Sequence, residues 1–530
     1  MIKKILFVFA CLISFASTTQ AQVVYKDVAP IFYSRCSSCH HEGSIYPPLN
    51  YYSSINNFKG VIAYNLNTGK MPPWMPDTTY VRFSHERIIT MSEKTKILNW
   101  ITAGAPYGTT LADTALAPPA PIFPKTKLNG TPDLIIKIPN FTSLATSADR
   151  YECFSIPTNL VQDRMIKAYE IVPNNPSIIH HAVLEIDTTG ASTTETTGSC
   201  YNINGGHVLL GDYAPGSAPI VFPSSSTEKF GLRIKQGSKM IAQMHYPAGS
   251  AGIVDSTEIR LFFYPVGTTN VRQIYTSVPL QNWSFLISAN TTATVTAKYP
   301  SGANTLPIDL SILSIFPHSH KICESIVNWA SNGTDTIPMC RINKWDFNWQ
   351  GFYTYPKFLK VPAGYKLHAK HVFNNTTSNP NNPSPALVTA GFATENEMLF
   401  DGIMYMPYQT GDELIDIDGM LSADPLLQPV NVQYLEKTFD NISVYPNPFT
   451  DKVKINYTLM LPQFTKLSIT NIMGQEVATL NSGIEAAGLH SYEWDGKNSA
   501  GAQLTSGVYF YKLQLGTKTQ SGKLILKSKN

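Results

Sequence analysis

The chain has 530 residues, more than one hydrophobic core usually serves, so we expect about two to four domains. Hydrophobic residues make up 43% of the sequence and charged residues 15%, which excludes a disordered chain and favours a β-rich exported protein. The 40 basic and 37 acidic residues give a formal net charge of +3. That balance does not indicate a nucleic-acid or membrane-surface binder.

Residues 1–21 predict a secretory signal peptide. Lys3 and Lys4 precede an apolar run over residues 5–16, and Thr19-Gln20-Ala21 forms a small-x-small cleavage site. The run is too short to span a membrane, and no other apolar stretch is long enough. We therefore expect an exported protein without a transmembrane segment, located outside the cell or at its surface.

Six cysteines follow the signal peptide, and an exported chain permits disulfides. Cys323 and Cys340 flank Asn332-Gly333, a strong hairpin-turn signal that favours a cross-strand disulfide between them. Cys153 and Cys200 would then pair by elimination only.

Residues 36–40 read Cys-Ser-Ser-Cys-His, which in an exported protein is the attachment motif of c-type haem. The thiols of Cys36 and Cys39 would bind the haem vinyl groups, and His40 would be an axial ligand of the iron. A disulfide or a zinc half-site is the alternative. A zinc site would need a second ligand pair, and none occurs before residue 150.

Met71 is the candidate for the second axial ligand of the haem. It lies in a Pro-rich loop, residues 69–75, that cannot be helical. Met/His ligation suits an electron-transfer haem. Met75 is a competing ligand and His41 a weaker one. A helix capped by Ser92 and ended by Gly104 would close this cytochrome c-like module.

The rest of the chain is rich in short apolar or alternating runs separated by turn residues, such as residues 134–138 and 365–373. This pattern predicts a mainly β protein with two antiparallel, jelly-roll-like β-sandwich domains, a small α-helical cytochrome c domain before them and a small β-sandwich after them. The predicted organisation is a signal peptide at 1–21, a haem domain at 22–113, a Pro-rich linker at 114–127, two sandwich domains at 128–270 and 271–425, a linker at 426–439 and a last domain at 440–530.

Histidines occur in three contexts that suggest metal binding: His180-His181, His245, and His318-Ser319-His320. In a strand, positions i and i+2 share a face, so His318 and His320 can chelate one metal. His180 and His181 would point to opposite faces unless the strand ends or bulges there. Each context taken alone also has an ordinary structural explanation.

Together with their neighbours these motifs resemble the copper type II, ascorbate-dependent monooxygenases, the family of peptidylglycine α-hydroxylating and dopamine β-monooxygenases. Residues 345–350 look like the bacterial branch, which similarly carries a haem module with a Met-Pro-Pro-Trp loop, so the resemblance extends over residues 22–425. The matching motifs are Tyr151-Glu152-Cys153, Ile179-His180-His181, Gln243-Met244-His245-Tyr246, Pro317-His318-Ser319-His320, Phe373-Asn374-Asn375, Asn379-Pro380-Asn381-Asn382-Pro383 and Glu397-Met398.

The resemblance implies two copper ions. One is an electron-transfer copper and the other binds dioxygen, and a thioether ligand favours the Cu(I) state of the latter. The implied ligands are His180, His181 and His245 for the first copper and His318, His320 and Met398 for the second. Met404 and Met406 are nearby alternatives to Met398. Zinc is the runner-up metal, but it would not recruit methionine.

The implied reaction is hydroxylation of a substrate C–H bond with O₂. Ascorbate or another electron donor supplies two electrons, and we expect the haem to relay them to the copper of His180, His181 and His245. The alternative is an exported haem electron-transfer or copper-binding surface protein without monooxygenase activity.

Two departures from the family bear on the substrate. Phe316 stands where the peptide hydroxylase has an arginine for the peptide carboxylate, and Phe400 and Gly402 stand where it has an asparagine and a tyrosine. No bidentate carboxylate clamp can be built from these residues. We therefore expect a more apolar pocket and do not expect a peptidylglycine substrate. The remaining histidines of this region are predicted to be structural or exposed, namely His207, His368 and His371.

Residues 440–530 resemble the type A sorting domain of the type IX secretion system of the Bacteroidota. The resemblance rests on Tyr445-Pro446-Asn447-Pro448, Gly474-Gln475-Glu476, Trp494-Asp495-Gly496 and Gly507-Val508-Tyr509. It implies export across the outer membrane by the type IX machinery, followed by removal of the domain. A carbohydrate-binding or fibronectin-like module is the alternative.

Overall fold

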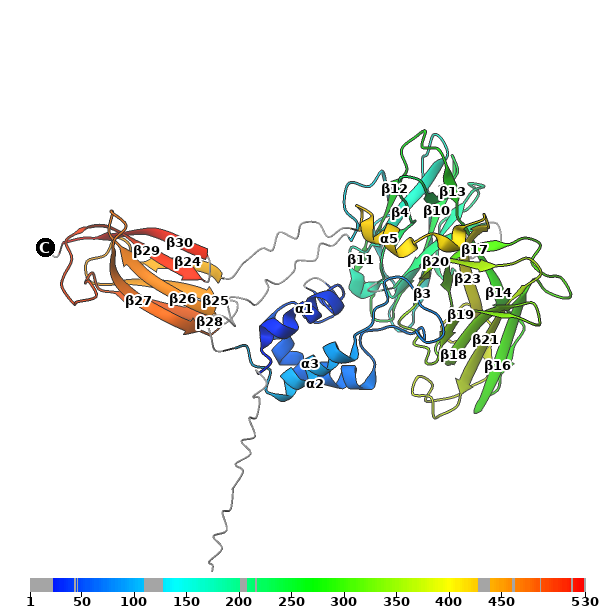
Figure 1. The fold of residues 1–530 in the computed structure, drawn as a ribbon, viewed down its shortest axis with the longest axis horizontal. Helices are drawn as coiled ribbons and strands as arrows, with labels where there is room; N and C mark the ends of the chain where they lie inside the picture. The colour runs from blue at the N-terminus through cyan, green and yellow to red at the C-terminus, as the bar shows by residue number, and fades with distance from the viewer. Residues whose placement is uncertain are drawn as a thin grey trace, which may run out of the picture.

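The computed structural model describes residues 22–41, 44, 46–108, 127–200, 207–214, 217–427, 439–459, 463–486, 488–515 and 518–528. The predicted signal peptide and most of both predicted linkers lie outside these residues. As predicted, the chain is mainly β, with a small helical domain before the sheets (Figure 1).

The N-terminal domain packs its helices around Trp100, which is fully buried. The indole N–H of Trp100 donates to the carbonyl of Pro106 at 2.9 Å, so its polar atom is satisfied within the core. The helices are α1 (Tyr25–Arg35), α2 (Tyr52–Thr68) and α3 (Met91–Thr102).

The start of α3 differs from the prediction, because Thr90 and not Ser92 caps the helix. The Thr90 hydroxyl accepts the N–H of Glu93 at 3.1 Å, and the Glu93 carboxylate accepts the N–H of Thr90 at 2.8 Å. This reciprocal capping box satisfies two backbone donors, which a cap at Ser92 could not do with Glu93 as its next residue.

The first sandwich has one sheet in the order β1-β12-β4-β9-β13, with β8 beside β4, and a second in the order β6-β3-β10-β5-β7. Because β13 pairs with β9, this domain extends slightly beyond the predicted boundary at residue 270. Its strands are β1 (Leu134–Lys137), β2 (Phe141–Thr142), β3 (Arg150–Pro157), β4 (Arg164–Val172), β5 (His181–Asp187), β6 (Glu195–Gly198), β7 (Val208–Tyr213), β8 (Ile220–Val221), β9 (Lys229–Ile234), β10 (Lys239–Tyr246), β11 (Val254–Asp255), β12 (Glu258–Phe263) and β13 (Val271–Gln273).

The second sandwich packs the sheet β14-β23-β17-β20 against the sheet β16-β21-β18-β19. The alternating burial of β21 places His371 in the core and leaves His368 half-buried on the other face, because residues three apart in a strand point to opposite faces. The strands are β14 (Tyr275–Asn282), β15 (Leu286–Ile287), β16 (Thr291–Tyr299), β17 (Leu310–Phe316), β18 (Cys323–Ser331), β19 (Thr336–Ile342), β20 (Tyr353–Val361), β21 (Lys366–Asn375), β22 (Val388–Thr389) and β23 (Leu399–Pro407).

The two sandwiches share a hydrophobic core. Phe358, Met404 and Met406 of the second sandwich belong to the core of the first, as do Ile417 and Leu421 of the short helix α5 (Ile417–Ala423). Their joint burial stabilises the sandwiches as one unit.

The N-terminal domain contacts the second sandwich through the loop that follows Met71. Pro76 forms a bridge pair with Ile342, and the Arg341 guanidinium donates to the Asp77 carboxylate at 2.7 and 2.9 Å. Phe83 from the same loop is buried in the core of the second sandwich. The predicted haem domain is therefore docked on the sandwich through this loop.

The C-terminal domain is a separate sandwich of the sheets β24-β25-β28 and β27-β26-β29-β30 around its own core, which includes Trp494. The strands are β24 (Phe439–Tyr445), β25 (Val453–Leu459), β26 (Gln463–Thr470), β27 (Glu476–Glu485), β28 (Gly488–Trp494), β29 (Gly507–Leu515) and β30 (Lys518–Leu526).

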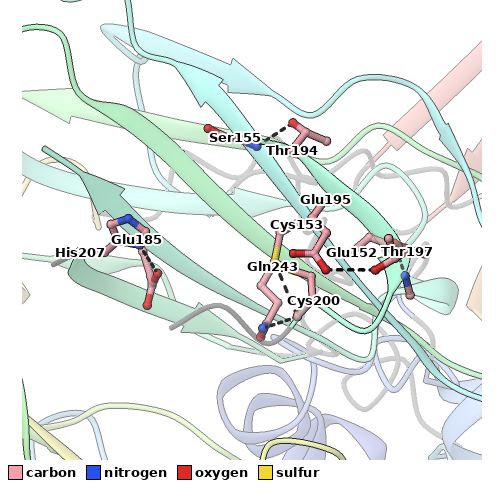
Figure 2. The surroundings of a disulfide bond; sticks show 11 residues. Glu152, Cys153, Ser155, Glu185, Thr194, Glu195, Thr197, Cys200, His207 and Gln243 are labelled. Atoms are coloured by element: carbon pink, nitrogen blue, oxygen red, sulfur yellow. Dashed lines mark hydrogen bonds and ion pairs between the residues drawn. A yellow bond between two sulfur atoms is a disulfide. The ribbon is translucent and has the colours of Figure 1, made fainter. Parts of the chain in front are cut away.

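A disulfide joins Cys153 on β3 to Cys200, which confirms the pairing predicted by elimination (Figure 2). Gln243 on β10 donates its side-chain N–H to the carbonyl of Cys200 at 2.9 Å. The disulfide therefore lies beside the strand that carries His245.

The favoured disulfide between Cys323 and Cys340 is not formed, and among the described cysteines both are buried free thiols. Strands β18 and β19 do form the hairpin around Asn332-Gly333. In their register Cys340 lies opposite Asn328, however, whereas Cys323 lies at the start of β18. The two side chains are therefore offset along the hairpin, so the prediction was wrong.

Candidate functional site

His180, His181 and His245, the trihistidine cluster, come together where β5 begins. His181 is the first residue of β5 and lies opposite His245 of β10. His180 precedes the strand, and its N–H donates to the carbonyl of His245 at 3.0 Å. Because His180 lies outside β5, it is not bound by the rule that neighbouring side chains of a strand point to opposite faces. All three histidine rings therefore face one another.

The ring nitrogens of this cluster are spaced as metal ligands. The Nδ1 atom of His181 lies 3.2 Å from Nδ1 of His180 and 3.1 Å from Nδ1 of His245. Two imidazole nitrogens bound tetrahedrally to zinc at about 2.0–2.1 Å lie about 3.3 Å apart. Three such nitrogens facing one another need a cation or a proton between them, and an imidazole set suits copper in either oxidation state.

Residues around the cluster orient His245. The Asp149 carboxylate lies 3.0 Å from Nε2 of His245, off the ring N–H direction, so this is an electrostatic contact and not a hydrogen bond. His245 in turn holds the pKa of Asp149 well below its usual value. Tyr151 stacks on His245 with ring centroids 4.3 Å apart. These contacts leave Nδ1 of His245 directed at the cluster.

His318 and His320 form the second group, and they differ from the prediction in one respect. Strand β17 ends at Phe316, so both histidines lie in the loop after the strand and not within it. Nδ1 of His318 contacts the side-chain oxygen of Gln350, and Nδ1 of His320 lies 2.9 Å from the carbonyl of Asn396. With each Nδ1–H donated to an oxygen, Nε2 of both rings is left as the ligand atom.

Burial keeps these histidines neutral. It lowers the pKa of His180 to about 4, that of His318 to about 3 and that of His320 to about 4, and it holds the pKa of His181 well below its usual value. Neighbouring imidazoles act in the same direction as burial in all four cases. Neutral imidazole is the form that binds a metal.

Met398 is buried and lines the same pocket as His318 and His320. These three residues are called the thioether site below. Met404 and Met406, the alternatives to Met398, are packed instead in the hydrophobic core shared by the two sandwiches. The described contacts therefore favour Met398 as the methionine of this site.

Glu397 ties the thioether site together, a role that sequence reasoning missed. Its buried carboxylate accepts the N–H of His320 at 2.9 Å, the N–H of Ile322 at 2.6 Å and the Ser319 hydroxyl at 3.0 Å. Burial raises the pKa of Glu397 to about 7, although these donors oppose the shift. The Glu397 side chain, next to Met398 in the chain, thus holds the backbone around His320 in place.

Asp401 is a second acidic residue that the sequence did not reveal. It accepts the N–H of His318 at 3.0 Å, and its other oxygen lies 3.0 Å from Nε2 of His371. His371 therefore supports the thioether site through Asp401, which refines its predicted structural role. The hydrophobic periodicity of the sequence does not reveal such residues, because their role depends on which backbone N–H groups their carboxylates contact in the folded chain.

One pocket joins the two groups of histidines. His181 of the trihistidine cluster lines it, together with all three residues of the thioether site. Asp212 also lines the pocket, and burial raises the pKa of its carboxyl to about 7. Four phenylalanines complete an apolar wall of the kind that the sequence predicts: Phe316, Phe352, Phe392 and Phe400.

Phe316 and Phe400 flank the predicted dioxygen-binding side of this pocket. The Phe316 ring stacks on His318 at 5.7 Å between centroids, and the Phe400 ring lies edge-on at 6.2 Å. No arginine lines the pocket among the described residues. A substrate carboxylate would therefore have no guanidinium group to pair with in this pocket, whereas an apolar group would be buried favourably.

The Cys-Ser-Ser-Cys-His motif follows α1 in a helical turn, in which the N–H groups of Cys39 and His40 donate to the carbonyl of Cys36. Residues three apart in such a turn share a face, so both thiols face the same side. Nδ1 of His40 lies 3.0 Å from the carbonyl of Pro47, which leaves Nε2 as the ligand atom. Burial lowers the pKa of His40 and keeps the ring neutral.

The structure distinguishes the two methionines of the predicted haem loop. Met75 packs against the second sandwich, and its sulfur accepts the N–H of Asp346 at 3.2 Å. Met71 stands at the start of the same loop, after α2, and lies outside that contact. Met71 therefore stays the predicted second ligand of the haem iron.

Residues 447–519 match the family model of the FlgD Ig-like domain, a match that covers the C-terminal sandwich and no other domain. No curated protein matches the chain. No helix among the described residues is long and apolar enough to cross a membrane.

Three solved structures can be compared with the chain. PorZ, a surface component of the type IX secretion system of Porphyromonas gingivalis, is 18% identical over 26% of this chain and 14% of PorZ, with a TM-score of 0.14. Latent PorU of the same organism is 10% identical over 72% of this chain and 34% of PorU, with a TM-score of 0.15. An FMN-binding β-glucuronidase of Faecalibacterium prausnitzii is 15% identical over 45% and 32%, with a TM-score of 0.13. The chain spans about a third of the length of these proteins or less, and such TM-scores support no functional argument.

Proposed function

We propose that this chain is a secreted copper-dependent monooxygenase that hydroxylates a C–H bond of an apolar substrate with dioxygen. The observation that supports this most strongly is the convergence of the trihistidine cluster and the thioether site on one pocket walled by phenylalanines. Copper fits both groups, because the first offers three neutral imidazoles and the second two imidazoles and a thioether.

The residues of the chain have separate tasks in this proposal. Copper would supply one-electron redox chemistry, and a copper held by His318, His320 and Met398 would also supply the place where dioxygen binds. Gln350 and Asn396 orient His318 and His320, while the phenylalanines exclude water and hold the apolar part of the substrate. One oxygen atom of O₂ enters the C–H bond and the other leaves as water, which requires two electrons from a donor.

For the electron donor, we propose that Cys36 and Cys39 would hold a c-type haem covalently and that His40 and Met71 would be the ligands of its iron. The Nδ1 contact of His40 with Pro47 supports this assignment, because it directs Nε2 outward as haem ligation requires. When bound, this haem would supply one-electron redox chemistry between ascorbate or another one-electron donor and the copper sites.

We also propose that the C-terminal sandwich is an export signal. We infer that residues 440–530 deliver the protein to the type IX secretion machinery and that the enzyme acts at the cell surface or outside the cell. The resemblance of its motifs to the type A sorting domain supports this, and the Ig-like fold of residues 447–519 is compatible with it.

Metal analysis combined with dioxygen uptake tests the proposal. We expect two coppers and one haem iron per mature chain, and ascorbate-driven O₂ uptake that rises when small compounds with a benzylic C–H bond are added. Bound haem and copper without substrate-dependent uptake would contradict the enzyme and favour an exported electron-transfer protein.

A further inference from the structure

Residues 345–350, here called the linking segment, connect β19 to β20 and contact both groups of histidines. The Trp345 indole N–H donates to the carbonyl of His320 at 2.9 Å. The Phe347 ring stacks on His180 with centroids 5.4 Å apart and lies 5.7 Å from the ring of His320. Phe347 therefore lies between the trihistidine cluster and the thioether site.

Hydrogen bonds fix the far end of the linking segment. The side chain of Gln350 contacts Nδ1 of His318 through its oxygen and donates its N–H to the carbonyl of Phe347 at 2.7 Å. The N–H of Trp349 donates to the carbonyl of Asp346 at 3.0 Å. The segment is a closed turn, so Trp349 and Gln350 are held in place together.

The same segment reaches the predicted haem domain at two points. The Tyr46 ring lies 5.3 Å from the His40 ring and 6.1 Å from the Trp349 ring, measured between centroids. On the other side, the N–H of Asp346 donates to the sulfur of Met75. A continuous path thus runs from the His40 ring through the rings of Tyr46 and Trp349, along the backbone from Trp349 to Gln350, and through the Gln350 side chain to His318.

We propose, building on the proposed function, that Tyr46 and Trp349 form the electron-transfer bridge between the haem and the copper sites. Electron tunnelling weakens steeply with distance through empty space and less through packed and hydrogen-bonded atoms, so this series is the favoured path. In each event one electron leaves ferrous haem, which becomes ferric, and reduces one cupric ion to cuprous. No bond is made or broken, and two events supply one hydroxylation.

From the bridge, two paths lead to the predicted copper sites. Gln350 leads to His318 of the thioether site, while Phe347 leads to His180 of the trihistidine cluster. The sequence-based expectation was a relay to the trihistidine cluster alone. In this proposal the contacts of the linking segment extend that relay, so that the copper of the thioether site also accepts electrons from the haem.

Flash reduction of the haem in the anaerobic protein loaded with Cu(II) tests this bridge. The haem absorbance follows reoxidation, and the electron paramagnetic resonance signal of Cu(II) follows copper reduction. In the wild type we expect a fast reoxidation phase, independent of protein concentration, with an equal loss of Cu(II) signal.

Variants then separate the bridge from a merely structural role. We expect Trp349→Leu and Tyr46→Leu to lose the fast phase, and Trp349→Phe to retain most of it, with haem and copper contents and the haem potential unchanged. Trp329→Leu is the matched control, because Trp329 stacks on His368 away from the linking segment, and it should keep the wild-type phase. If Trp349→Leu misfolds, Tyr46→Leu at full haem and copper content decides the question, because it should lose the fast phase and a wild-type rate would exclude the path.

Three results would overturn the bridge in distinguishable ways. A wild-type rate in both Trp349→Leu and Tyr46→Leu at full haem and copper content would exclude this path while leaving the proposed enzyme intact. A wild-type protein that binds haem and copper but has no intramolecular phase would exclude any haem relay. Failure to bind copper at all would instead contradict the proposed function together with the bridge.

Discussion

The trihistidine cluster and the thioether site face the same pocket but are built differently. The cluster is anchored on two paired strands, with His181 opposite His245, and its three Nδ1 atoms already lie at ligand spacing. The thioether site lies in loops, where the clamp of Glu397 and Asp401 replaces the sheet. A site on paired strands suits a copper that only gains and loses an electron. A site in loops with a soft sulfur ligand suits a copper that must also admit O₂ and substrate.

The largest expected effect comes from removing one ligand of each group. His318→Ala should reduce copper from two ions per chain to one and lower O₂ uptake to background, because the thioether site keeps only one imidazole. His245→Ala should also leave one copper, with a different Cu(II) resonance spectrum. His368→Ala, a histidine outside both groups, is the control. Retention of two coppers in His318→Ala would show that the two groups are not separate sites.

Glu397→Ala should mainly damage the thioether site. Several buried donors would lose their acceptor, each at a cost on the order of 1–3 kcal/mol, so we expect a large drop in the free energy of unfolding measured in urea. Glu397→Gln keeps one acceptor oxygen and should lose less. Glu324→Ala, on the exposed face of β18, is the control. Equal loss of both coppers in Glu397→Gln would contradict the separation of the two sites.

Loss of the Cys153–Cys200 disulfide should mainly affect the trihistidine cluster. Replacing Cys153 and Cys200 with alanine removes a cross-link beside β10 and should cost about 2–4 kcal/mol of unfolding free energy. Reduction of the wild type should give the same melting temperature as the variant. The variant should lose copper from the trihistidine cluster before it loses copper from the thioether site. The opposite order would contradict this prediction.

The smallest effect is expected at the contact between the haem domain and the second sandwich. Asp77→Ala removes a partly exposed ion pair with Arg341, worth about 1 kcal/mol or less. It should leave both coppers in place and increase proteolysis of the loop after Met71. Asp163→Ala breaks an ion pair with Arg233 within the first sandwich and is the matched control. Equal proteolysis of that loop in both variants would contradict a docking role for Asp77.

Part of this organisation could be predicted from the chain itself. The mainly β class follows from composition and turn signals, and the structure confirms it. The Cys153–Cys200 pairing is confirmed as well, although the Cys323–Cys340 disulfide that led to it by elimination does not form. His180, His181 and His245 do come together, because His180 falls just outside β5. Their metal and the reaction stay predictions.

Other features of the fold and the site depend mainly on contacts between segments that are far apart in the sequence, so the sequence alone did not predict them. Asp149 and Asp401 act on histidines far along the chain, and no local pattern reports such a contact. Cys323 and Cys340 failed to pair because the hairpin register, not the turn, decides which residues face each other. Thr90 was missed as the cap of α3, although its spacing to Glu93 fits a capping box.

X-ray absorption of the copper-loaded, reduced protein tests the central claim most directly. The account predicts a copper–sulfur contribution in the wild type that survives in His245→Ala and disappears in Met398→Leu. A sulfur contribution that persists in Met398→Leu, or none in a wild type holding two coppers, would contradict the thioether site.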